Sequence, residues 1–293
     1  MDNSYGLEKQ QKENLGILKA VTGICEKHGL HYVLDSGTLL GAVRHHGFIP
    51  WDDDVDIAMT RESYERFRTL APAELPQDML LVTPERMAEH NDAFYDFTPR
   101  VELLSRTRFE ENEESRYFGG LNNHPWVDIF ILDCLPDSGA AAAFSRFLQK
   151  AVYAMAMGHR FALKMDRYHG AQKLGVSFFS AVGKLFPMKK LAAFQDRAAK
   201  RYEGKKTRKL YYSDYAPDWL WCSIDRKMLT RVKAPFEDIE AFIPEHYDEI
   251  LKMLYGDYMK LPDEEKRRPV HDGTEYVNSG DAQRKNAEGN KGE

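Results

Sequence analysis

The stretch GTLLGAVRHHGFIPWDDDVDI, residues 37–57, places four aspartates among apolar residues. Ionised carboxylates resist burial unless a partner neutralises them, so this stretch has to border a polar site. We expect a strand over residues 54–59, in which Asp54 and Asp56 point to one face while the residues between them point into the core. Two carboxylates that face each other repel, and a divalent cation between them removes that cost.

The residue types and their spacing limit the metal that such a site takes. Oxygen ligands with no cysteine or well-spaced histidine nearby favour Mg²⁺ or Mn²⁺ over Zn²⁺. Asp52, Asp54 and Asp56 have the spacing of the first, third and fifth positions of an EF-hand calcium loop. That loop also needs a central glycine and a closing glutamate, and this chain has Ile57 and Ser63 there. The pattern therefore excludes an EF-hand.

Other residues of the stretch keep two interpretations. Asp52 and Asp53 are either loop charges or carboxylates that help to hold a metal. His45 and His46 lie in a loop, where paired histidines are solvated more often than they bind a ligand. A solvated acidic turn is the alternative for the whole stretch, and the apolar residues on both sides of it argue against that alternative.

A third carboxylate is needed to hold two metals around the attacking and the leaving oxygen of a phosphoryl transfer. Asp128 is the candidate, because in WVDIF (residues 126–130) it alternates with apolar residues and so points away from the core. A capping or edge-strand aspartate is the alternative. We predict that Asp54, Asp56 and Asp128 converge as catalytic residues and metal ligands.

Residues that suit a phosphate group precede the aspartates. Gly37 and Thr38 follow an expected strand and open a helical piece, so they offer backbone N–H groups, a hydroxyl and little side-chain bulk. Arg44 adds a forked cationic donor that fits phosphate. An ion pair between Arg44 and one of the aspartates is the alternative.

Composition bounds the class of protein. The 293 residues are 43% hydrophobic and 30% charged, which is typical of globular proteins. The N-terminus has no apolar stretch of signal-peptide length, and no run is long enough to cross a bilayer. Cys25, Cys134 and Cys222 are odd in number and far apart, so they indicate no disulfide framework. We expect a protein of the reducing cytoplasm.

Charge is distributed unevenly along the chain. Residues 140–210 hold 16 Lys and Arg and three acidic residues, although the net charge of the chain is -5. The segment also carries many aromatic residues but no nucleic-acid reader motif, so we expect no nucleic acid as a partner. Basic and aromatic helices suit an anionic membrane surface, which is the interpretation we favour. A solvated helical face packed onto the catalytic domain is the alternative.

Periodicity and turn residues predict an α+β fold. Helices are expected over residues 7–28, 39–44, 61–70 and 246–255, with two or three more in 140–204 broken near Gly170 and Pro187. Strands are expected over residues 32–34, 54–59, 80–83, 97–104 and 126–132, and a solvated loop over 110–115. We divide the chain into a catalytic core (1–139), a basic helical insertion (140–210), a part that completes the catalytic domain (211–271) and a disordered tail (272–293).

Together, these motifs resemble a known family. A Gly-Thr turn followed by an Asp-hydrophobic-Asp strand is similar to the nucleotidyltransferase superfamily, and the full string at residues 37–57 resembles the LicD family. Bacterial members of that family include phosphocholine transferases, and animal relatives include fukutin-type ribitol-phosphate transferases. The resemblance returns in VDIFILDCLP (residues 127–136) and in YGDYMKLPDEEKR (residues 255–267), followed by His271.

The resemblance implies a nucleotidyltransferase-like mixed β-sheet flanked by helices, to which the basic helical segment is added. It also implies that Asp54 and Asp56 on one strand and Asp128 on a neighbouring strand are the ligands of Mg²⁺ or Mn²⁺. The family often has proline at the position of Ile131. This departure is minor, because the aspartate remains.

The resemblance further assigns residues to the donor. Gly37 and Thr38 match the family's donor-phosphate turn, and Arg44 matches its motif arginine. Lys260 and His271 match a C-terminal signature, for which donor contacts and a surface turn are the two interpretations. The sequence therefore predicts these five residues as the donor-binding set.

The function implied is a metal-dependent phosphotransferase. It moves a phosphate-linked group such as phosphocholine from a CDP-linked donor to a sugar hydroxyl of a cell-surface glycan precursor, in lipopolysaccharide, teichoic acid or capsule. Acceptors of bacterial members are often lipid-linked, which implies work at the inner face of the membrane. Two alternatives stay open: a sugar-nucleotide glycosyltransferase with an Asp-x-Asp metal site, and a non-catalytic nucleotide-binding protein.

Overall fold

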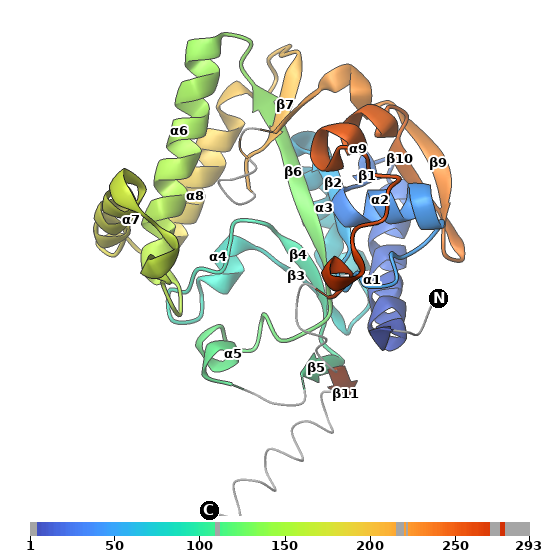
Figure 1. Ribbon diagram of the computed structural model, residues 1–293. Coiled ribbons are helices and arrows are strands. Elements are labelled where there is room, and N and C mark those ends of the chain that lie inside the picture. The colour runs from blue at the N-terminus through green and yellow to red at the C-terminus, as the bar shows by residue number, and fades with distance from the viewer. Residues whose placement is uncertain (1–4, 109–111, 215–219, 221, 270–275, 279–293) are drawn as a thin grey trace, which may run out of the picture.

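The computed structural model describes residues 5–108, 112–214, 220, 222–269 and 276–278. One mixed sheet runs through the centre of the molecule, helices flank it, and a group of helices lies to one side (Figure 1). The predicted α+β class and the mixed sheet flanked by helices are confirmed.

Helices and strands alternate along about the first third of the chain. The helices are α1 (Glu8–Lys27), α2 (Ser36–His45), α3 (Arg61–Glu74), α4 (Pro84–Met87), α5 (Glu113–Tyr117), α6 (Gly139–Ala156), α7 (Gly170–Gly183), α8 (Met188–Ala199) and α9 (Tyr247–Tyr255). Short 3-10 turns are η2 (Met157–His159), η3 (Met165–Arg167), η4 (Lys200–Tyr202), η6 (Arg226–Leu229) and η7 (Glu264–Lys266). The strands are β1 (Tyr32–Leu34), β2 (Asp56–Thr60), β3 (Met79–Val82), β4 (Arg100–Leu103), β5 (Arg106–Arg108), β6 (Trp126–Leu135), β7 (Lys209–Tyr212), β8 (Ser223–Asp225), β9 (Arg231–Phe236), β10 (Ile239–Pro244) and β11 (Tyr276–Asn278).

The long strand β6 organises the main sheet, whose order is β1-β2-β6-β4-β3 with β7 and β8 attached through β6. It pairs in parallel with β2, and antiparallel with β4 at its start and with β7 at its end. The register places Asp128 opposite Asp56 on one side and opposite Arg100 on the other. Sheet pairing thus brings together three charged residues that are far apart in the sequence.

Helix α1 closes the core, because its apolar residues recur at helical spacing. Leu15, Leu18, Val21 and Cys25 are all buried and belong to the central hydrophobic cluster. The helix packs against β4 and β6 and contacts α3. All residues of strand β1 are buried, and they belong to the same hydrophobic cluster.

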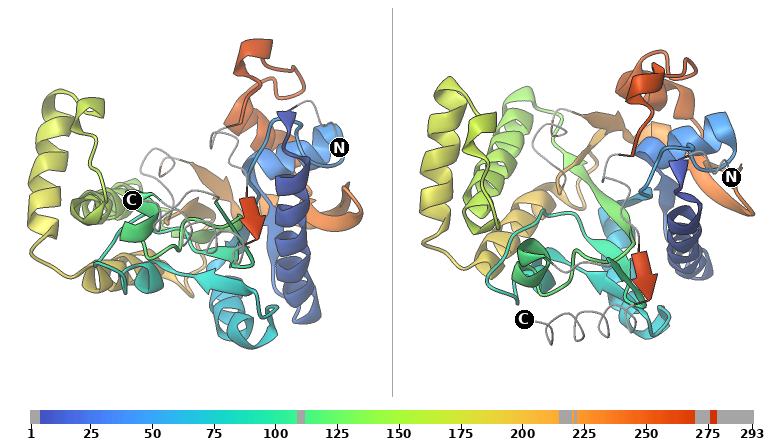
Figure 2. Two further views of the ribbon diagram at one scale, coloured as in Figure 1. Left: turned by 90° about the horizontal axis from the view of Figure 1, so that it is seen from below. Right: turned by 60° about the horizontal axis from the view of Figure 1, so that its bottom comes forward.

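Helices α7 and α8 each pack on α6 beside the sheet, as Figure 2 shows from two further directions. Their own core includes Val152, Met157 and Leu191, and it takes in Phe94 and Phe97 from the segment before β4. A Cβ atom at Gly183 would overlap the carbonyl oxygen of Met155, so a glycine is required where α7 crosses α6. None of the described helices combines the length and the apolar character needed to cross a bilayer.

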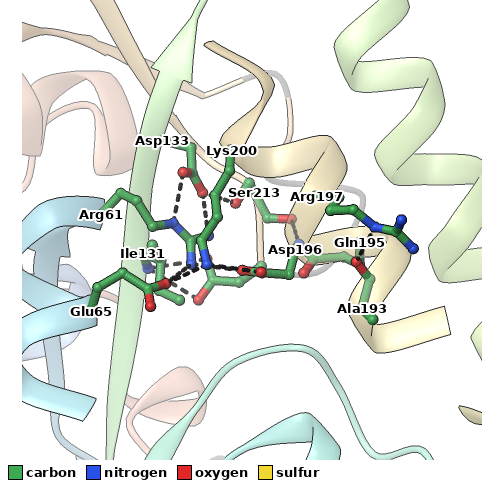
Figure 3. Close-up of polar contacts among 11 residues, drawn as sticks. Arg61, Glu65, Ile131, Asp133, Ala193, Gln195, Asp196, Arg197, Lys200 and Ser213 are labelled. Carbon is green, nitrogen blue, oxygen red and sulfur yellow. Dashed lines mark hydrogen bonds and ion pairs between the residues drawn. The ribbon is translucent and has the colours of Figure 1, made fainter. Parts of the chain in front are cut away.

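A buried ion-pair network, which we call the Arg61 network, fixes this helical group to the sheet (Figure 3). The guanidinium of Arg61 on α3 donates to both oxygens of Asp133 on β6, at 2.9 and 2.7 Å. It also lies 3.1 Å from the carboxylate of Asp196 on α8, and Lys200 bridges Asp196 to Glu65 at 2.8 and 2.7 Å. One arginine therefore joins three elements.

Several predicted boundaries were wrong. The stretch 110–115, predicted as a loop, contains the start of α5, whose first residue Glu113 follows the cap Asn112. Strand β2 begins at Asp56 rather than at residue 54. In the tail predicted to be disordered, residues 276–278 form β11, which pairs antiparallel with β5. A strand needs a partner, and this partner lies about half the chain away.

Candidate active site

The first turn of α2 is attached to the first residue of β2. The hydroxyl of Thr38 accepts a hydrogen bond of 2.9 Å from the backbone N–H of Asp56. The backbone N–H of Asp35 donates to the carbonyl of Asp56 at 3.1 Å, and the side chain of Asp35 caps α2 by accepting from the N–H of Ser36 at 2.8 Å. The turn and the aspartate strand therefore form one rigid unit.

Gly37 makes room for a carboxylate. A Cβ atom at this position would lie 2.6 Å from Oδ2 of Asp52. From the sequence, we related the absence of a side chain at Gly37 to phosphate binding. In the structure, the carboxylate of Asp52 takes up that space. The predicted helical start at residue 39 was also late, because α2 begins at Ser36 and so includes Gly37 and Thr38.

Side-chain amides of helix α1 donate hydrogen bonds to the backbone of the loop that carries the aspartates. Gln10 and Asn14 donate to the carbonyl of Asp53 at 2.7 and 3.1 Å. Gln11 donates to the carbonyl of Asp52 at 2.9 Å. These amides are buried, so the loop conformation is fixed by α1 and not by solvent.

The loop brings together the carboxylates of Asp52, Asp53 and Asp54, and Asp56 follows them in the sequence. We call these four residues the cluster. One ligand atom from each of Asp52, Asp53 and Asp54 lies within 4.8 Å of the others, the spacing at which they could share a metal ion. Burial raises the pKa of Asp56 well above its ordinary value, and the carboxylates of Asp54 and Asp128 raise it further. Burial and the neighbouring Asp54 and Asp53 raise the pKa of Asp52 in the same way. The cluster therefore needs positive charge from a ligand or from protons.

Asp128 lies against a cation and an indole. Its Oδ1 is 3.1 Å from Nη2 of Arg100, and its Oδ2 accepts a hydrogen bond of 2.9 Å from Nε1 of Trp126. The same Arg100 nitrogen lies 2.9 Å from Asp96. Burial alone would lower the pKa of Arg100, but the carboxylates of Asp128 and Asp96 raise it above its ordinary value. Arg100 thus positions Asp128 at the edge of the cluster.

A pocket of about 490 Å³, which we call the donor pocket, opens beside the cluster. Asp52 and Gly37 lie in its wall together with Arg44, Lys260 and Trp51. Arg44 donates from Nη1 to the carbonyl of Tyr258 at 2.6 Å, which joins α2 to the segment after α9. The structure therefore brings three of the predicted site residues together here, Gly37, Arg44 and Lys260, although Thr38 does not line the pocket.

Three histidines that were predicted or left open have other outcomes. His271 lies outside the described residues. His45 accepts a hydrogen bond of 3.4 Å from Arg44 and lies edge-on to Trp51, and burial lowers its pKa. His46 ends α2 in a left-handed conformation, with a φ of 57°.

Comparison with known proteins shows to which family the chain belongs. The family model described as LicD/FKTN/FKRP, nucleotidyltransferase domain, matches residues 29–131. The chain is 30% identical to the lipopolysaccharide cholinephosphotransferase LicD of Haemophilus influenzae over 290 residues, which is 92% of this chain and 98% of that protein. The chain belongs to the LicD family.

Other relatives match a much shorter part of the chain. The ribitol 5-phosphate transferases FKRP of mouse and human are each 44% identical over 54 residues, which is 18% of this chain and 11% of those proteins. The family assignment from sequence is therefore confirmed, and the long match covers the helical group as well as the catalytic motifs.

Sequence reasoning missed three residues of this LicD-family site. Asp35 is buried, which raises its pKa to about 6, and it accepts a hydrogen bond of 2.7 Å from the hydroxyl of Tyr212. Burial raises the pKa of Tyr255, and Asp56 and Asp35 beside it raise it further. The cap position of Asp35 before a Ser-Gly-Thr helix start was a usable signal. Arg100 had none, because only strand pairing places it beside Asp128.

Proposed function

We propose that this LicD-family phosphotransferase moves a phosphate-linked group, such as phosphocholine, from a CDP-linked donor to a sugar hydroxyl of a cell-surface glycan precursor. The observation that carries the proposal is the continuity between the donor pocket and the carboxylate cluster, which share Asp52. The long match to a lipopolysaccharide cholinephosphotransferase supports the class of group and of acceptor.

We propose Mg²⁺ or Mn²⁺ as the cofactor. The donor set fits such a cation, because the cluster offers carboxylate oxygens that repel one another, and burial together with neighbouring carboxylates raises the pKa values of Asp52 and Asp56. Asp54, Asp56 and Asp128 remain the proposed ligands, and the close approach of Asp52 and Asp53 to Asp54 makes them further candidates. When bound, the cation would neutralise phosphate charge and lower the pKa of the attacking hydroxyl.

The chain's own residues would hold the donor. Arg44 and Lys260 bring positive charge to the pocket wall, as the diphosphate of a nucleotide requires. Trp51 and Tyr255 offer ring surfaces beside them. His271 stays a proposed donor contact on the family resemblance alone.

In the proposed transfer, the acceptor oxygen attacks the phosphorus that carries the transferred group, and the bond from that phosphorus to the nucleotide phosphate breaks. The leaving group is CMP. Asp128, held by Arg100 and Trp126, would accept the proton of the attacking hydroxyl.

Substitution of the cluster tests this mechanism. We expect Asp54→Asn and Asp56→Asn each to abolish transfer from CDP-choline while circular dichroism and melting temperature stay near those of the wild type, since removing one of several repelling carboxylates does not weaken the fold. Asp238→Asn, an exposed carboxylate in the turn between β9 and β10, serves as the matched control and should keep full activity. Substantial transfer by either cluster variant would contradict the assignment.

The donor class is tested separately by thermal shift. CDP-choline and CDP-ribitol with Mg²⁺ should raise the melting temperature, because a ligand that binds only the folded state stabilises it. Stabilisation by UDP-sugars instead would favour the glycosyltransferase alternative. Binding of CDP donors without turnover on any glycan would favour the non-catalytic alternative.

We also propose that the helical group contacts an anionic membrane on the cytoplasmic side. Phe147, Leu174, Phe178 and Leu185 are exposed on it by 56, 73, 64 and 78%, in a segment rich in Lys and Arg. The three cysteines are free thiols, which suits a reducing compartment.

Liposome flotation tests the membrane contact. The wild type should float with vesicles that contain anionic lipid and stay behind with neutral ones, because the segment supplies both charge and apolar side chains. Leu174→Ser/Phe178→Ser should lose flotation and keep its melting temperature, since both side chains are exposed. If the wild type stayed in the lipid-free fraction to the same extent with anionic and with neutral vesicles, the proposal would be contradicted.

A further inference from the structure

A small polar pocket of about 140 Å³, which we call the Asn pocket, is lined by Arg100 and Trp126, the two residues that contact the carboxylate of Asp128. Its wall includes Arg100, Trp126, Ser115, Asn122 and Asn123. We infer that the Asn pocket binds one sugar ring of the acceptor and presents its hydroxyl to Asp128. The inference rests on the proposed function and extends it by assigning the acceptor site.

Unpaired polar atoms in the wall indicate a ligand. Ser115 and Asn123 are each only 4% exposed. The hydroxyl of Ser115 and the side-chain oxygens of Asn122 and Asn123 have no hydrogen-bond partner among the described residues. Buried polar atoms are nearly always paired. Three unpaired oxygens around one hollow therefore indicate that a ligand pairs with them.

The unpaired atoms are held in place by other contacts. The amide nitrogen of Asn123 donates to the hydroxyl of Thr107 at 2.7 Å, and this bond fixes the orientation of the Asn123 side chain without using its oxygen. The side chain of Asn112 caps α5 by accepting from the backbone N–H of Ser115 at 2.7 Å, so the serine hydroxyl takes no part in the cap. The polar wall is therefore preformed.

The Asn pocket is linked to the reaction centre through two of its own residues. Trp126 and Arg100 line it, and both also bind the carboxylate of Asp128. The donor pocket meets the cluster through Asp52 instead. An acceptor in the Asn pocket and a donor in the donor pocket would thus approach the carboxylates through different residues.

The chemistry of the wall favours a carbohydrate. Amide and hydroxyl oxygens need hydrogen-bond donors, and sugar hydroxyls supply them and also accept from a guanidinium. The indole of Trp126 provides a flat apolar surface next to these groups. A trimethylammonium group has no N–H or O–H, so it would leave the oxygens unpaired.

A second hollow of about 330 Å³ continues the Asn pocket, since Tyr95 and Glu114 line both. Phe161 and Tyr168 add rings to it, and Lys164 adds positive charge. It therefore suits the following residues of an oligosaccharide, including one that carries an anionic substituent.

Removal of the unpaired groups tests the inference without damage to the fold. Ser115→Ala/Asn122→Ala removes two side-chain oxygens that have no hydrogen-bond partner among the described residues, so the variant should melt at or above the wild-type temperature. Ser145→Ala is the matched control, because Ser145 is also buried but donates to the carbonyl of Ala141 in its own helix. Binding is measured by saturation-transfer NMR on the full chain with the methyl glycosides of glucose, galactose, N-acetylglucosamine and N-acetylgalactosamine.

We expect at least one glycoside to bind the wild type and the control equally, and to bind the double variant about fivefold to tenfold more weakly. Stabilisation of the double variant by CDP-choline should be unchanged. Failure of all four glycosides to bind, or equal binding by the double variant, would overturn the inference. Failure of CDP donors to stabilise the wild type would instead count against the proposed function, so the two failures are distinguishable.

Discussion

At the scale of single residues, Glu102 on β4 is a buried carboxylate that lies outside the cluster. It is 1% exposed, and neither of its oxygens has a hydrogen-bond partner among the described residues. Burial raises its pKa well above its ordinary value of 4.5, although Arg100 opposes this, and Asp128 adds to it. The folded protein therefore holds a proton there more tightly than the unfolded chain does.

Glu102→Gln should stabilise the protein in a pH-dependent way. Because the folded-state pKa is raised, the wild type loses stability as the pH rises above the unfolded value, and a neutral glutamine does not. We expect the melting temperature of the variant to exceed that of the wild type by about 2 °C or more near pH 8, and the gap to shrink toward pH 4. A gap that stays constant with pH would contradict the explanation.

The residues of the site differ in how far the sequence could predict them. Asp54, Asp56, Gly37 and Arg44 lie within one short stretch, and their residue types express their chemistry directly. The neighbours that give them their environment come from elsewhere in the chain. Gln10 reaches the loop from α1, and nothing in its local sequence marks it as a support.

At the scale of elements, the link between α2 and β2 depends on one hydroxyl. Thr38→Val should destabilise the protein by about 1–3 kcal/mol, because the buried N–H of Asp56 loses its acceptor. Thr38→Ser keeps the hydroxyl and is the matched control. Urea unfolding measures the difference, and equal midpoints for the two variants would show that this bond is dispensable.

Helix α5 shows why an element was missed. The acidic stretch around it has little apolar periodicity, so it was predicted as a loop. Asn112 nevertheless caps the helix through the backbone N–H of Ser115, and Glu113 and Glu114 occupy the first turn, where negative charge is favourable. Capping residues were the better signal here, because a short helix has too few turns to show a periodic face.

At the scale of the whole molecule, the Arg61 network joins the helical group to the catalytic sheet. Arg61→Met should destabilise the protein by about 3–5 kcal/mol, because it leaves Asp133 buried without its cation. The double variant Arg61→Met/Asp133→Leu should recover part of that loss, since both charges are gone.

Guanidinium-chloride unfolding of both variants measures the effect. Lys252→Met is the control, because Lys252 pairs with Asp248 on an exposed face of α9 and should change stability by less than about 0.5 kcal/mol. If Arg61→Met behaved like this control, the network would not hold the helical group in place.

The sequence by itself determined the family, the α+β class, most of the described helices, the strands β1, β2, β3, β4 and β6, and the candidate carboxylates of the site. Such features depend on neighbouring residues, through periodicity and side-chain type. Only the tertiary structure decided that Arg100 lies against Asp128, that Lys260 joins Gly37 in the donor pocket, and that Arg100 also lines the Asn pocket. These contacts join segments far apart in the chain, and no local pattern encodes them because packing and strand register alone bring their side chains together.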